Sequence, residues 1–372
     1  MFVILGNKLF SGTKDELTIE TPHANSFNEL DRFIRLHNGE HILCFISYDL
    51  KNSIENLHSN NKDHILFPII KCIVPISIES FVSLEKITEK FQGPDQGQIL
   101  FEPELNKEEY QSYVKKIKGH IQLGDIYETN FCYQWKSKAS SFNGLSVFNK
   151  LKNLTEAPFT VYADLDDHII ISASPERFIK KTGNQLLSQP IKGTAKRSKN
   201  KKEDLAIVQQ LKKDPKERTE NIMIVDLVRN DLSKIAVKNS VKVNNLCSVH
   251  TFKNIHQMIS DVSCDIKKGT SFSEILKATF PMGSMTGVPK IRAMELMEKY
   301  ESSKRGLYSG SIGMISPNGD FDMNVIIRTL LYNKKNHYLS FNVGGAITME
   351  SDPAKEYEET ITKASSILEA CK

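Results

Sequence analysis

Alternating apolar and polar positions predict β-hairpins in the middle and the C-terminal part of the chain. The segments "FTVYADLDDHIIISAS" and "RFIKKTGNQLLSQPI" predict strand pairs that turn at Asp166–Asp167 and at Gly183–Asn184. Three more strand-like runs lie between Gly306 and Ile347, and Asn318-Gly319 marks a hairpin turn between the first two. The start of the chain, "MFVILGNKLF", is also predicted to be a strand.

Apolar residues at helical spacing interrupt these strands. Asn106 with Glu109 forms a capping-box pattern, and the helix that it opens is expected to stop at Gly124. Hairpins mixed with helices favour an α+β architecture over strict strand-helix alternation. The sequence contains neither the dinucleotide-binding glycine pattern after a strand nor the P-loop pattern, so nucleotide binding has no support. The further helices are predicted at about Lys201–Lys213, Thr219–Arg229, Phe272–Phe280, Pro289–Glu301 and Asp352–Cys371.

A glycine- and proline-rich stretch divides the chain unequally. At 372 residues the chain suits one large domain or two subdomains. The stretch from Phe91 to Tyr110 is the nearest thing to a boundary. We therefore expect a short N-terminal subdomain, residues 1–95, and a catalytic domain, residues 96–372.

Composition limits the classes of partner. A formal charge of +4 from 49 basic and 45 acidic residues argues against a nucleic-acid-binding surface. No apolar run approaches the roughly 20 residues that span a bilayer, and the N-terminus lacks the basic region of a signal peptide. The six scattered cysteines fit reduced thiols in a cytoplasm rather than a structural zinc site. The sequence predicts a cytoplasmic protein whose partner is a small molecule or another protein.

Lys192 lies in an unusual place for a surface charge. In "SQPIKGTAKRS" it stands between Ile191 and Gly193, in a turn that holds the amine close to the backbone. It is either a solvated loop charge or a working amine.

Carboxylates at helical spacing form a second candidate. Glu356, Glu359 and Lys363 lie on one face of the C-terminal helix, where a solvated face with a Glu359–Lys363 pair is the simpler explanation. Glu220 precedes the apolar turn "IMIV", where burial of an acid is costly unless it is paired, protonated or bound to a metal. Two carboxylates near each other would hold a hard cation.

Several groups suited to anions complete the candidates. Thr286 lies in "GSMTG" ahead of a predicted helix, Gly344–Gly345 end a strand where backbone can approach a ligand, and Arg328 interrupts the apolar run "NVIIRTL". Glu176 follows Pro175 at the entry to a strand. Any one of these could belong to a structural ion pair. Together they favour a small polyanionic substrate with a divalent cation.

Ordered motifs in the chain resemble those of the chorismate-binding enzymes, which include anthranilate synthase component I, aminodeoxychorismate synthase component I and the isochorismate and salicylate synthases. The resemblance covers roughly residues 102–372 and implies an α+β fold, a large antiparallel β-sandwich with flanking helices around a Mg²⁺-chorismate site. The motifs are "SASPERFI", "PIKGTAKR", "ENIMIVDLVRNDL", "FPMGSMTGVPKIRAMELM", "SGSIG", "IIRTL", "VGGAI" and "EYEET".

The resemblance implies a role for each matching residue. Glu220 and Glu359 match the Mg²⁺ carboxylates, with Glu356 as a nearer or water-mediated ligand. Glu176 matches the general acid that assists loss of the 4-hydroxyl. His256 matches a family histidine near the ring, and a satisfied core histidine is its alternative. The expected substrate-binding groups are Arg328, Lys363, Tyr308, Thr286, Gly344 and Gly345.

Lys192 indicates the branch of the family. Anthranilate and isochorismate synthases carry Ala at this position, and "PIKGT" resembles the aminodeoxychorismate synthases of para-aminobenzoate and folate synthesis. The resemblance implies amination of chorismate at C4 with ammonia from a separate glutamine amidotransferase subunit. A neutral Lys192 would be the nucleophile, its pKa lowered by the ring and a cation. Glu128 departs from the family, since most amination branches have Gln there and the isochorismate group has a lysine base nearby.

Two other functions remain open at this point. The nearer is anthranilate synthase component I, which would release pyruvate and form ortho-aminobenzoate. The other is a non-catalytic chorismate-binding regulatory protein, which the intact lysine and carboxylates disfavour.

Overall fold

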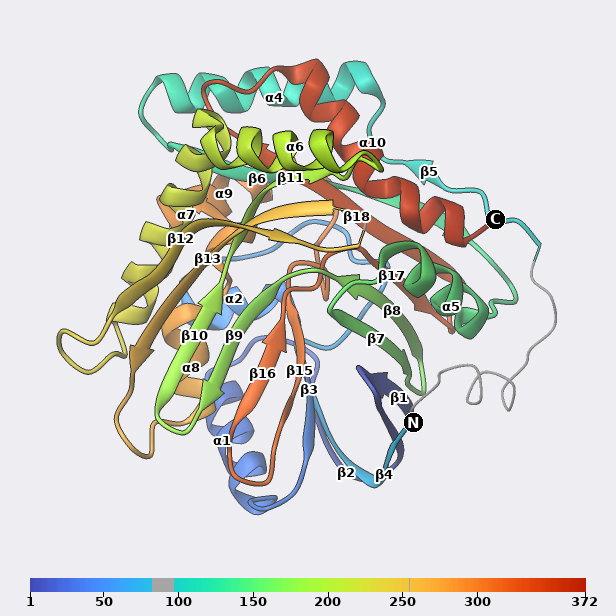
Figure 1. Ribbon diagram of the computed structural model, residues 1–372. Coiled ribbons are helices and arrows are strands. Elements are labelled where there is room, and N and C mark those ends of the chain that lie inside the picture. The colour runs from blue at the N-terminus through green and yellow to red at the C-terminus, as the bar shows by residue number, and fades with distance from the viewer. Residues whose placement is uncertain (82–96, 254) are drawn as a thin grey trace.

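The computed structural model describes residues 1–81, 97–253 and 255–372 (Figure 1). It confirms the α+β class, a large antiparallel sheet with flanking helices. In the described ranges the strands are β1 (Phe2–Leu5), β2 (Lys8–Ile19), β3 (Ile42–Ile46), β4 (Ile70–Ser80), β5 (Glu102–Pro103), β6 (Glu128–Lys138), β7 (Phe159–Asp164), β8 (His168–Ser174), β9 (Arg177–Thr182), β10 (Gln185–Gln189), β11 (Ile191–Lys196), β12 (Lys242–Thr251), β13 (Ile255–Asp265), β14 (Gly287–Val288), β15 (Ser311–Ile315), β16 (Phe321–Asn324), β17 (Thr329–Asn333) and β18 (Tyr338–Ile347).

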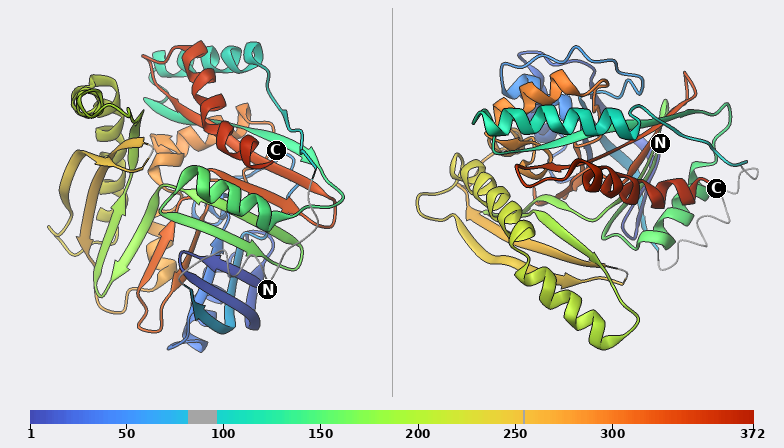
Figure 2. Two further views of the ribbon diagram at one scale, coloured as in Figure 1. Left: turned by 45° about the vertical axis from the view of Figure 1, so that its right-hand side comes forward. Right: turned by 90° about the horizontal axis from the view of Figure 1, so that it is seen from above.

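The helices lie mostly on the outer faces of the sheet, as the two further views in Figure 2 show. None of those in the described ranges combines the length and the apolarity that crossing a bilayer requires. Their bounds are α1 (Ser26–Leu36), α2 (Lys51–Ile54), α4 (Lys107–Gln122), α5 (Gly144–Thr155), α6 (Lys201–Lys213), α7 (Pro215–Ser233), α8 (Phe272–Thr279), α9 (Lys290–Tyr300) and α10 (Pro353–Ala370), with 3-10 turns at Tyr48–Leu50 and Gly283–Met285.

Strand pairing links the sheet into one curved array. Following the antiparallel pairs gives the order β5-β6-β18-β17-β8-β7-β1-β2-β4-β3-β15-β16-β9-β10-β13-β12. Strand β11 also pairs with β13, and the short β14 pairs with β6. Strands β6 and β11 therefore lie near opposite ends of the order, and a side-chain contact between them requires the sheet to curl.

The N-terminal strands lie inside this array rather than beside it. Strand β1 pairs with β7, and β3 pairs with β15. The expected boundary at residues 91–110 falls partly outside the described residues, so the division into residues 1–95 and 96–372 stays a prediction.

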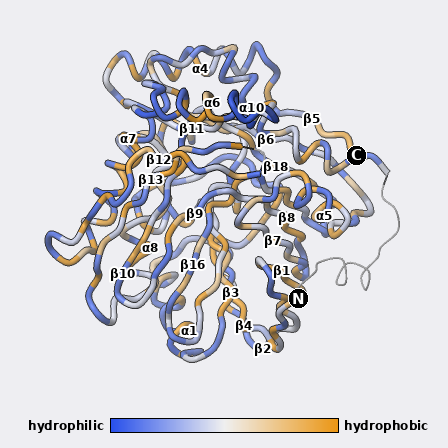
Figure 3. The backbone as a smooth tube through the Cα atoms, viewed as in Figure 1, coloured by the Kyte–Doolittle hydropathy of each residue, from blue (hydrophilic) through white to orange (hydrophobic). Residues whose placement is uncertain are grey.

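Three large apolar clusters hold the layers together. One contains Val3, Phe45, Val161 and Ile170 and fills the space between facing strands. The other two lie under helices: α4, α5 and α10 cover one, and α1, α7 and α8 cover the other. Figure 3 shows hydrophobic and hydrophilic residues mixed along most elements, as expected where one face of a strand or helix is buried.

The predicted turns form where the sequence placed them. Asp166–Asp167 join β7 to β8, Gly183–Asn184 join β9 to β10, and Asn318-Gly319 lies between β15 and β16. The Asn106–Glu109 capping box is present, and Gly124 follows α4 with a φ of 78°. Helix α7 is longer than expected, because Asp214 caps an earlier start at Pro215.

Candidate active site

Lys192 projects from an irregular part of β11. The register of β11 against β13 shifts between Ile191 and Thr194, and Gly193 has a φ of 84°. This left-handed conformation favours glycine. The Lys192 side chain is only 12% exposed, and its Nζ lies 2.9 Å from Oε1 of Glu128. Burial and this contact contradict the interpretation of Lys192 as a solvated loop charge.

Glu128 begins β6, where β14 holds the strand at close range. Gly287 of β14 pairs with Thr129, and a Cβ on Gly287 would lie 2.3 Å from the Glu128 carbonyl oxygen. Only glycine fits this approach. Glu128 is 1% exposed, and its Oε2 has no hydrogen-bond partner among the described residues.

The carboxylates around Lys192 oppose the effect of burial on its pKa. Burial by itself lowers the pKa of a lysine, but the carboxylates of Glu128, Glu220 and Glu176 together raise the pKa of Lys192 above its ordinary value. The sequence led us to expect a lowered pKa. That expectation concerned a site that holds the substrate ring and a cation, so it stays a prediction; without them the carboxylates dominate, and Glu217 and Glu359 also interact with Lys192.

Glu176 is an acid that keeps its proton to a much higher pH than an ordinary glutamate. It lies between β8 and β9 and is 5% exposed. Burial raises its pKa to about 7, although a hydrogen bond with Ser284 and the charge of Lys192 act in the opposite direction. A carboxyl group of this kind can donate a proton at physiological pH.

Helices α7 and α10 bring two buried carboxylates around one lysine. Nζ of Lys216 lies 3.2 Å from Glu356 Oε1 and 3.8 Å from Glu220 Oε1. Burial raises the pKa of Glu220 to about 7, and its Oε1 makes no hydrogen bond with any residue that the structure describes. The two acids share a positive charge that α7 itself supplies.

These carboxylates fit a divalent cation in part. No three His, Cys, Asp or Glu side chains within the described ranges lie close enough together to form a ready metal site. The carboxylates of Glu220 and Glu356 nevertheless both lie within 4 Å of the Lys216 ammonium. Oε1 of Glu220 is buried without a hydrogen-bond partner among the described residues, so the two acids are suited to a hard cation. Glu359 is half exposed and lies 2.6 Å from Lys363, so its carboxylate is held separately.

The paired glycines have different roles. A Cβ on Gly344 would lie 2.4 Å from the Phe131 carbonyl oxygen, so Gly344 permits close strand pairing with β6. A Cβ on Gly345 would instead approach Glu356 Oε2 at 3.5 Å and Lys363 Nζ at 3.9 Å. Gly345 therefore opens toward the charged groups of α10, while Lys363 donates to the Gly344 carbonyl at 2.8 Å.

Arg328 keeps a free guanidinium. It precedes β17 with a φ of 53°, rather than lying within a strand as the sequence suggested. Burial lowers its pKa, which the nearby Tyr308 and Glu359 oppose. Among the described residues it has no carboxylate partner within ion-pair distance, so the anion that such a group requires has to come from outside. Tyr308 is buried beside it, with its hydroxyl 3.6 Å from Cys132 Sγ.

Thr286 is a structural residue in this state. It is 2% exposed, and its hydroxyl is near the carbonyl groups of Met282 and Gly283. Its own carbonyl accepts from the Asn130 amide at 2.8 Å. The "GSMTG" segment does not run directly into α9, since β14 intervenes, and it contributes Ser284 to Glu176 instead.

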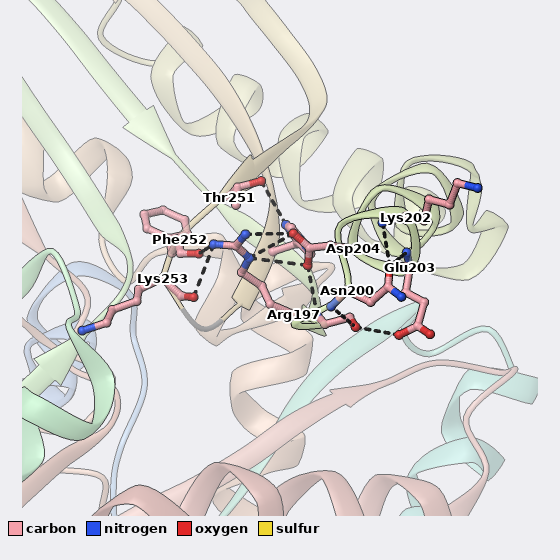
Figure 4. A network of polar contacts seen from close by, with 10 residues as sticks. Arg197, Asn200, Lys202, Glu203, Asp204, Thr251, Phe252 and Lys253 are labelled. Atoms are coloured by element: carbon pink, nitrogen blue, oxygen red, sulfur yellow. Dashed lines mark hydrogen bonds and ion pairs between the residues drawn. The ribbon is translucent and has the colours of Figure 1, made fainter.

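His256 belongs to a separate polar network. Its Nε2 lies 2.9 Å from Asp204 of α6, and its Nδ1 lies 3.0 Å from the Thr251 hydroxyl. Arg197 also pairs with Asp204 (Figure 4). His256 is 1% exposed with both ring nitrogens bonded, which corresponds to the satisfied core histidine. In this structure it holds α6 against β12 and β13, and its predicted place near the ring stays a prediction.

Two functional residues escaped the sequence interpretation. Lys216 resembles any exposed helix lysine, and its spacing to Glu220 was the only available signal. Ser284 was visible within "GSMTG" but had no predicted partner. Both depend on contacts between elements that are distant in the chain.

Comparisons with known proteins identify the family of this chain. The family model described as "chorismate binding enzyme" matches residues 6–369. The chain belongs to the chorismate-binding enzyme family. The match extends into the N-terminal strands, whereas the motifs quoted above cover roughly residues 102–372.

Relatives from more than one branch match at similar identity. Anthranilate synthase component 1 of Aquifex aeolicus is 35% identical over 72% of this chain and 53% of its own length. Aminodeoxychorismate synthase component 1 of Klebsiella aerogenes is 36% identical over 71% of this chain and 58% of its own length. The chain thus spans little more than half the length of these two relatives.

Solved structures show the same fold. Anthranilate synthase component I from Streptococcus pneumoniae superimposes with a TM-score of 0.84 at 24% identity, over 99% of this chain and 92% of that one. The menaquinone-specific isochorismate synthase of Escherichia coli gives 0.77 at 16% identity, over 100% and 88%. At these identities the likeness establishes the fold alone.

Proposed function

We propose that this chain aminates chorismate at C4 and forms 4-amino-4-deoxychorismate, with ammonia from a partner glutamine amidotransferase, as an aminodeoxychorismate synthase component I. The observation that carries the proposal is Lys192, a buried amine placed among Glu128, Glu176 and Glu220. The para-aminobenzoate and folate pathway and a cytoplasmic location belong to the same proposal.

Two displacements account for amination at C4. Lys192 attacks C2 of chorismate, and the 4-hydroxyl leaves as water after taking the proton of Glu176. Ammonia then adds at C4, the C2–nitrogen bond breaks, and Lys192 is released. Glu176 suits the first step because its raised pKa of about 7 keeps a substantial fraction of it protonated in neutral solution.

The remaining charged groups would hold the substrate. Arg328 has no carboxylate partner in the part of the chain that the structure describes, and Lys363 lies beside Gly345, so both are suited to the carboxylates of chorismate. Glu220 and Glu356, with Glu359 nearby, would hold Mg²⁺, which would neutralise and orient a substrate carboxylate. Lys216 would have to yield its place between the two acids.

Anthranilate synthase component I is the second candidate. The 35% identity to the Aquifex relative favours it as much as the Klebsiella relative favours amination at C4. Lys192 decides our preference, because the resemblance implies that the family members that release pyruvate have Ala at this position.

Product analysis tests the proposal. The purified chain is incubated with chorismate, Mg²⁺ and an ammonium salt, and the products are separated by chromatography. We expect 4-amino-4-deoxychorismate from the wild type and a loss of several orders of magnitude in Lys192→Ala. The matched control is Lys196→Ala, which removes an exposed lysine of the same strand and should remain active. Anthranilate as the only product, or full activity of Lys192→Ala, would refute the proposal.

A further inference from the structure

The structure leaves the resting Lys192 in the wrong form for a nucleophile. Its Nζ lies 2.9 Å from a carboxylate oxygen of Glu128, and only a neutral amine can attack carbon. Four further acids interact with it: Glu176 between β8 and β9, Glu217 and Glu220 on α7, and Glu359 on α10. All of them favour the charged ammonium, so the proton needs an acceptor at the moment of attack.

Glu128 is placed to be that acceptor. It accepts a hydrogen bond from the Lys192 ammonium, and it belongs to β6, near the other end of the strand order from β11. Its carboxylate is 1% exposed and is neutralised by no second cation among the described residues. The proton would arrive on Oε1, which already accepts the Lys192 hydrogen bond, and Oε2 is buried without a hydrogen-bond partner among the described residues.

We propose that Glu128 is the catalytic base that takes the proton of Lys192 and so generates the neutral nucleophile. This inference rests on the proposed function. It assigns a role to Glu128, at a position where the resemblance implies Gln in most amination branches of the family.

The proton that Lys192 loses passes to Glu128 and later returns to Lys192. Lys192 ammonium and Glu128 carboxylate become amine and carboxylic acid, and no charge leaves the site. The amine forms its bond to C2 as the C4–oxygen bond breaks, and the hydroxyl departs as water with the proton of Glu176. When ammonia later displaces the lysine, the released amine recovers its proton from Glu128. Glu176 is reprotonated from solvent.

The mechanism predicts an unusual pH dependence. The ion pair and the neutral pair contain the same number of protons, so the wild-type rate of lysine attack should not rise with pH. Without a carboxylate at position 128 the lysine must lose its proton to solvent, and the rate of attack should rise about tenfold per pH unit below the lysine pKa. Because other titrations are common to both proteins, the ratio of the two rates isolates this effect.

The experiment measures the first step without ammonia. Wild type, Glu128→Gln and Glu128→Asp receive chorismate with saturating Mg²⁺ between about pH 6 and 8.5, and adduct formation on Lys192 is followed by rapid quench, intact-protein mass spectrometry and peptide mapping. We expect Glu128→Gln to be slower at pH 7 by at least about tenfold, with the ratio of wild-type to variant rate falling as pH rises. Glu128→Asp should keep the wild-type profile at a lower rate. Glu104→Gln is the matched control, because Glu104 follows β5 and accepts a hydrogen bond from the Gln134 amide rather than from Lys192.

Contrary outcomes are equally definite. If Glu128 is only a counter-ion, its removal lowers the pKa of Lys192 and makes Glu128→Gln as fast as wild type or faster at low pH, which overturns the inference. If Glu128→Gln does not fold, the wild type alone tests the inference. A wild-type rate of adduct formation that rises about tenfold per pH unit below pH 7 would also overturn it. A wild type that forms neither an adduct nor 4-amino-4-deoxychorismate refutes the proposed function and this inference together. Amination through Lys192 with a constant rate ratio refutes the inference alone.

Discussion

Two residues of the site have pKa values that burial and neighbouring charges move away from their ordinary values. Glu176 is a buried acid with its pKa raised to about 7, and Lys192 is a buried amine with its pKa raised by surrounding carboxylates. Desolvation opposes charge in both, but only Lys192 has enough opposite charges nearby to overcome it. The site therefore combines an acid that is ready to donate with a nucleophile that has to be activated.

The titration of Glu176 gives a prediction for activity. Its raised pKa means that the proton needed by the leaving hydroxyl is present below about pH 7 and is lost as pH rises through that value. With free ammonia held constant, we expect turnover to fall about tenfold per pH unit above pH 7. Steady-state rates across pH measure this, and Glu176→Gln should be inactive throughout. A wild-type rate that is still constant at pH 9 would exclude Glu176 as the acid.

Helices α7 and α10 meet at the site through an ion-pair cluster rather than an apolar contact. Lys216 of α7 lies within 4 Å of the buried carboxylates of Glu220 and Glu356. An uncompensated pair of buried acids would repel each other strongly. The lysine thus offsets the repulsion between the two carboxylates and keeps the two helices compatible.

Removal of that lysine should increase the affinity for a divalent cation. In Lys216→Met the two carboxylates lose their internal counter-ion, and we expect Mn²⁺ to bind at least about tenfold more tightly without substrate. The electron paramagnetic resonance signal of free Mn²⁺ measures binding directly and does not depend on turnover. Lys202→Met, at an exposed lysine of α6, is the control. Equal affinities in wild type and Lys216→Met would show that the cation binds elsewhere.

At the scale of the whole molecule, the curl of one sheet creates the site. Glu128 and Lys192 lie 64 residues apart in the chain and on strands near opposite ends of the pairing order. The N-terminal strands β1–β4 bridge the two halves through the β1–β7 and β3–β15 pairs. They also contribute Val3, Phe10 and Phe45 to the cluster between the facing strands.

This bridging predicts that the N-terminal strands are indispensable for folding. A fragment of residues 97–372 would expose the edges of β7 and β15 and half of the apolar cluster between the strands. We expect it to aggregate or to unfold without a cooperative transition, whereas the full chain should melt cooperatively. Circular dichroism with thermal melting compares the two. A cooperative transition in the fragment would support an independent domain at residues 96–372.

Local chemistry allowed the sequence alone to predict many elements. The hairpin at Asp166–Asp167, the capping box at Asn106 and the bounds of α6 depend on backbone preferences and hydrogen bonds within a few residues. The motifs around Glu176 and Lys192 were recognisable for a related reason, since each is a short run whose residue types suit one kind of chemistry.

Only the tertiary structure decided which of these groups meet. Hydrophobic spacing says which face of a strand is buried but not which distant strand covers it, because that depends on how the complete sheet curls. The approach of Glu128 to Lys192, the placement of Lys216 between two acids and the attachment of His256 to α6 all depend on this arrangement. The direction of the Lys192 pKa depends on it as well, because the energy of a buried charge is set by neighbours contributed from three separate parts of the chain.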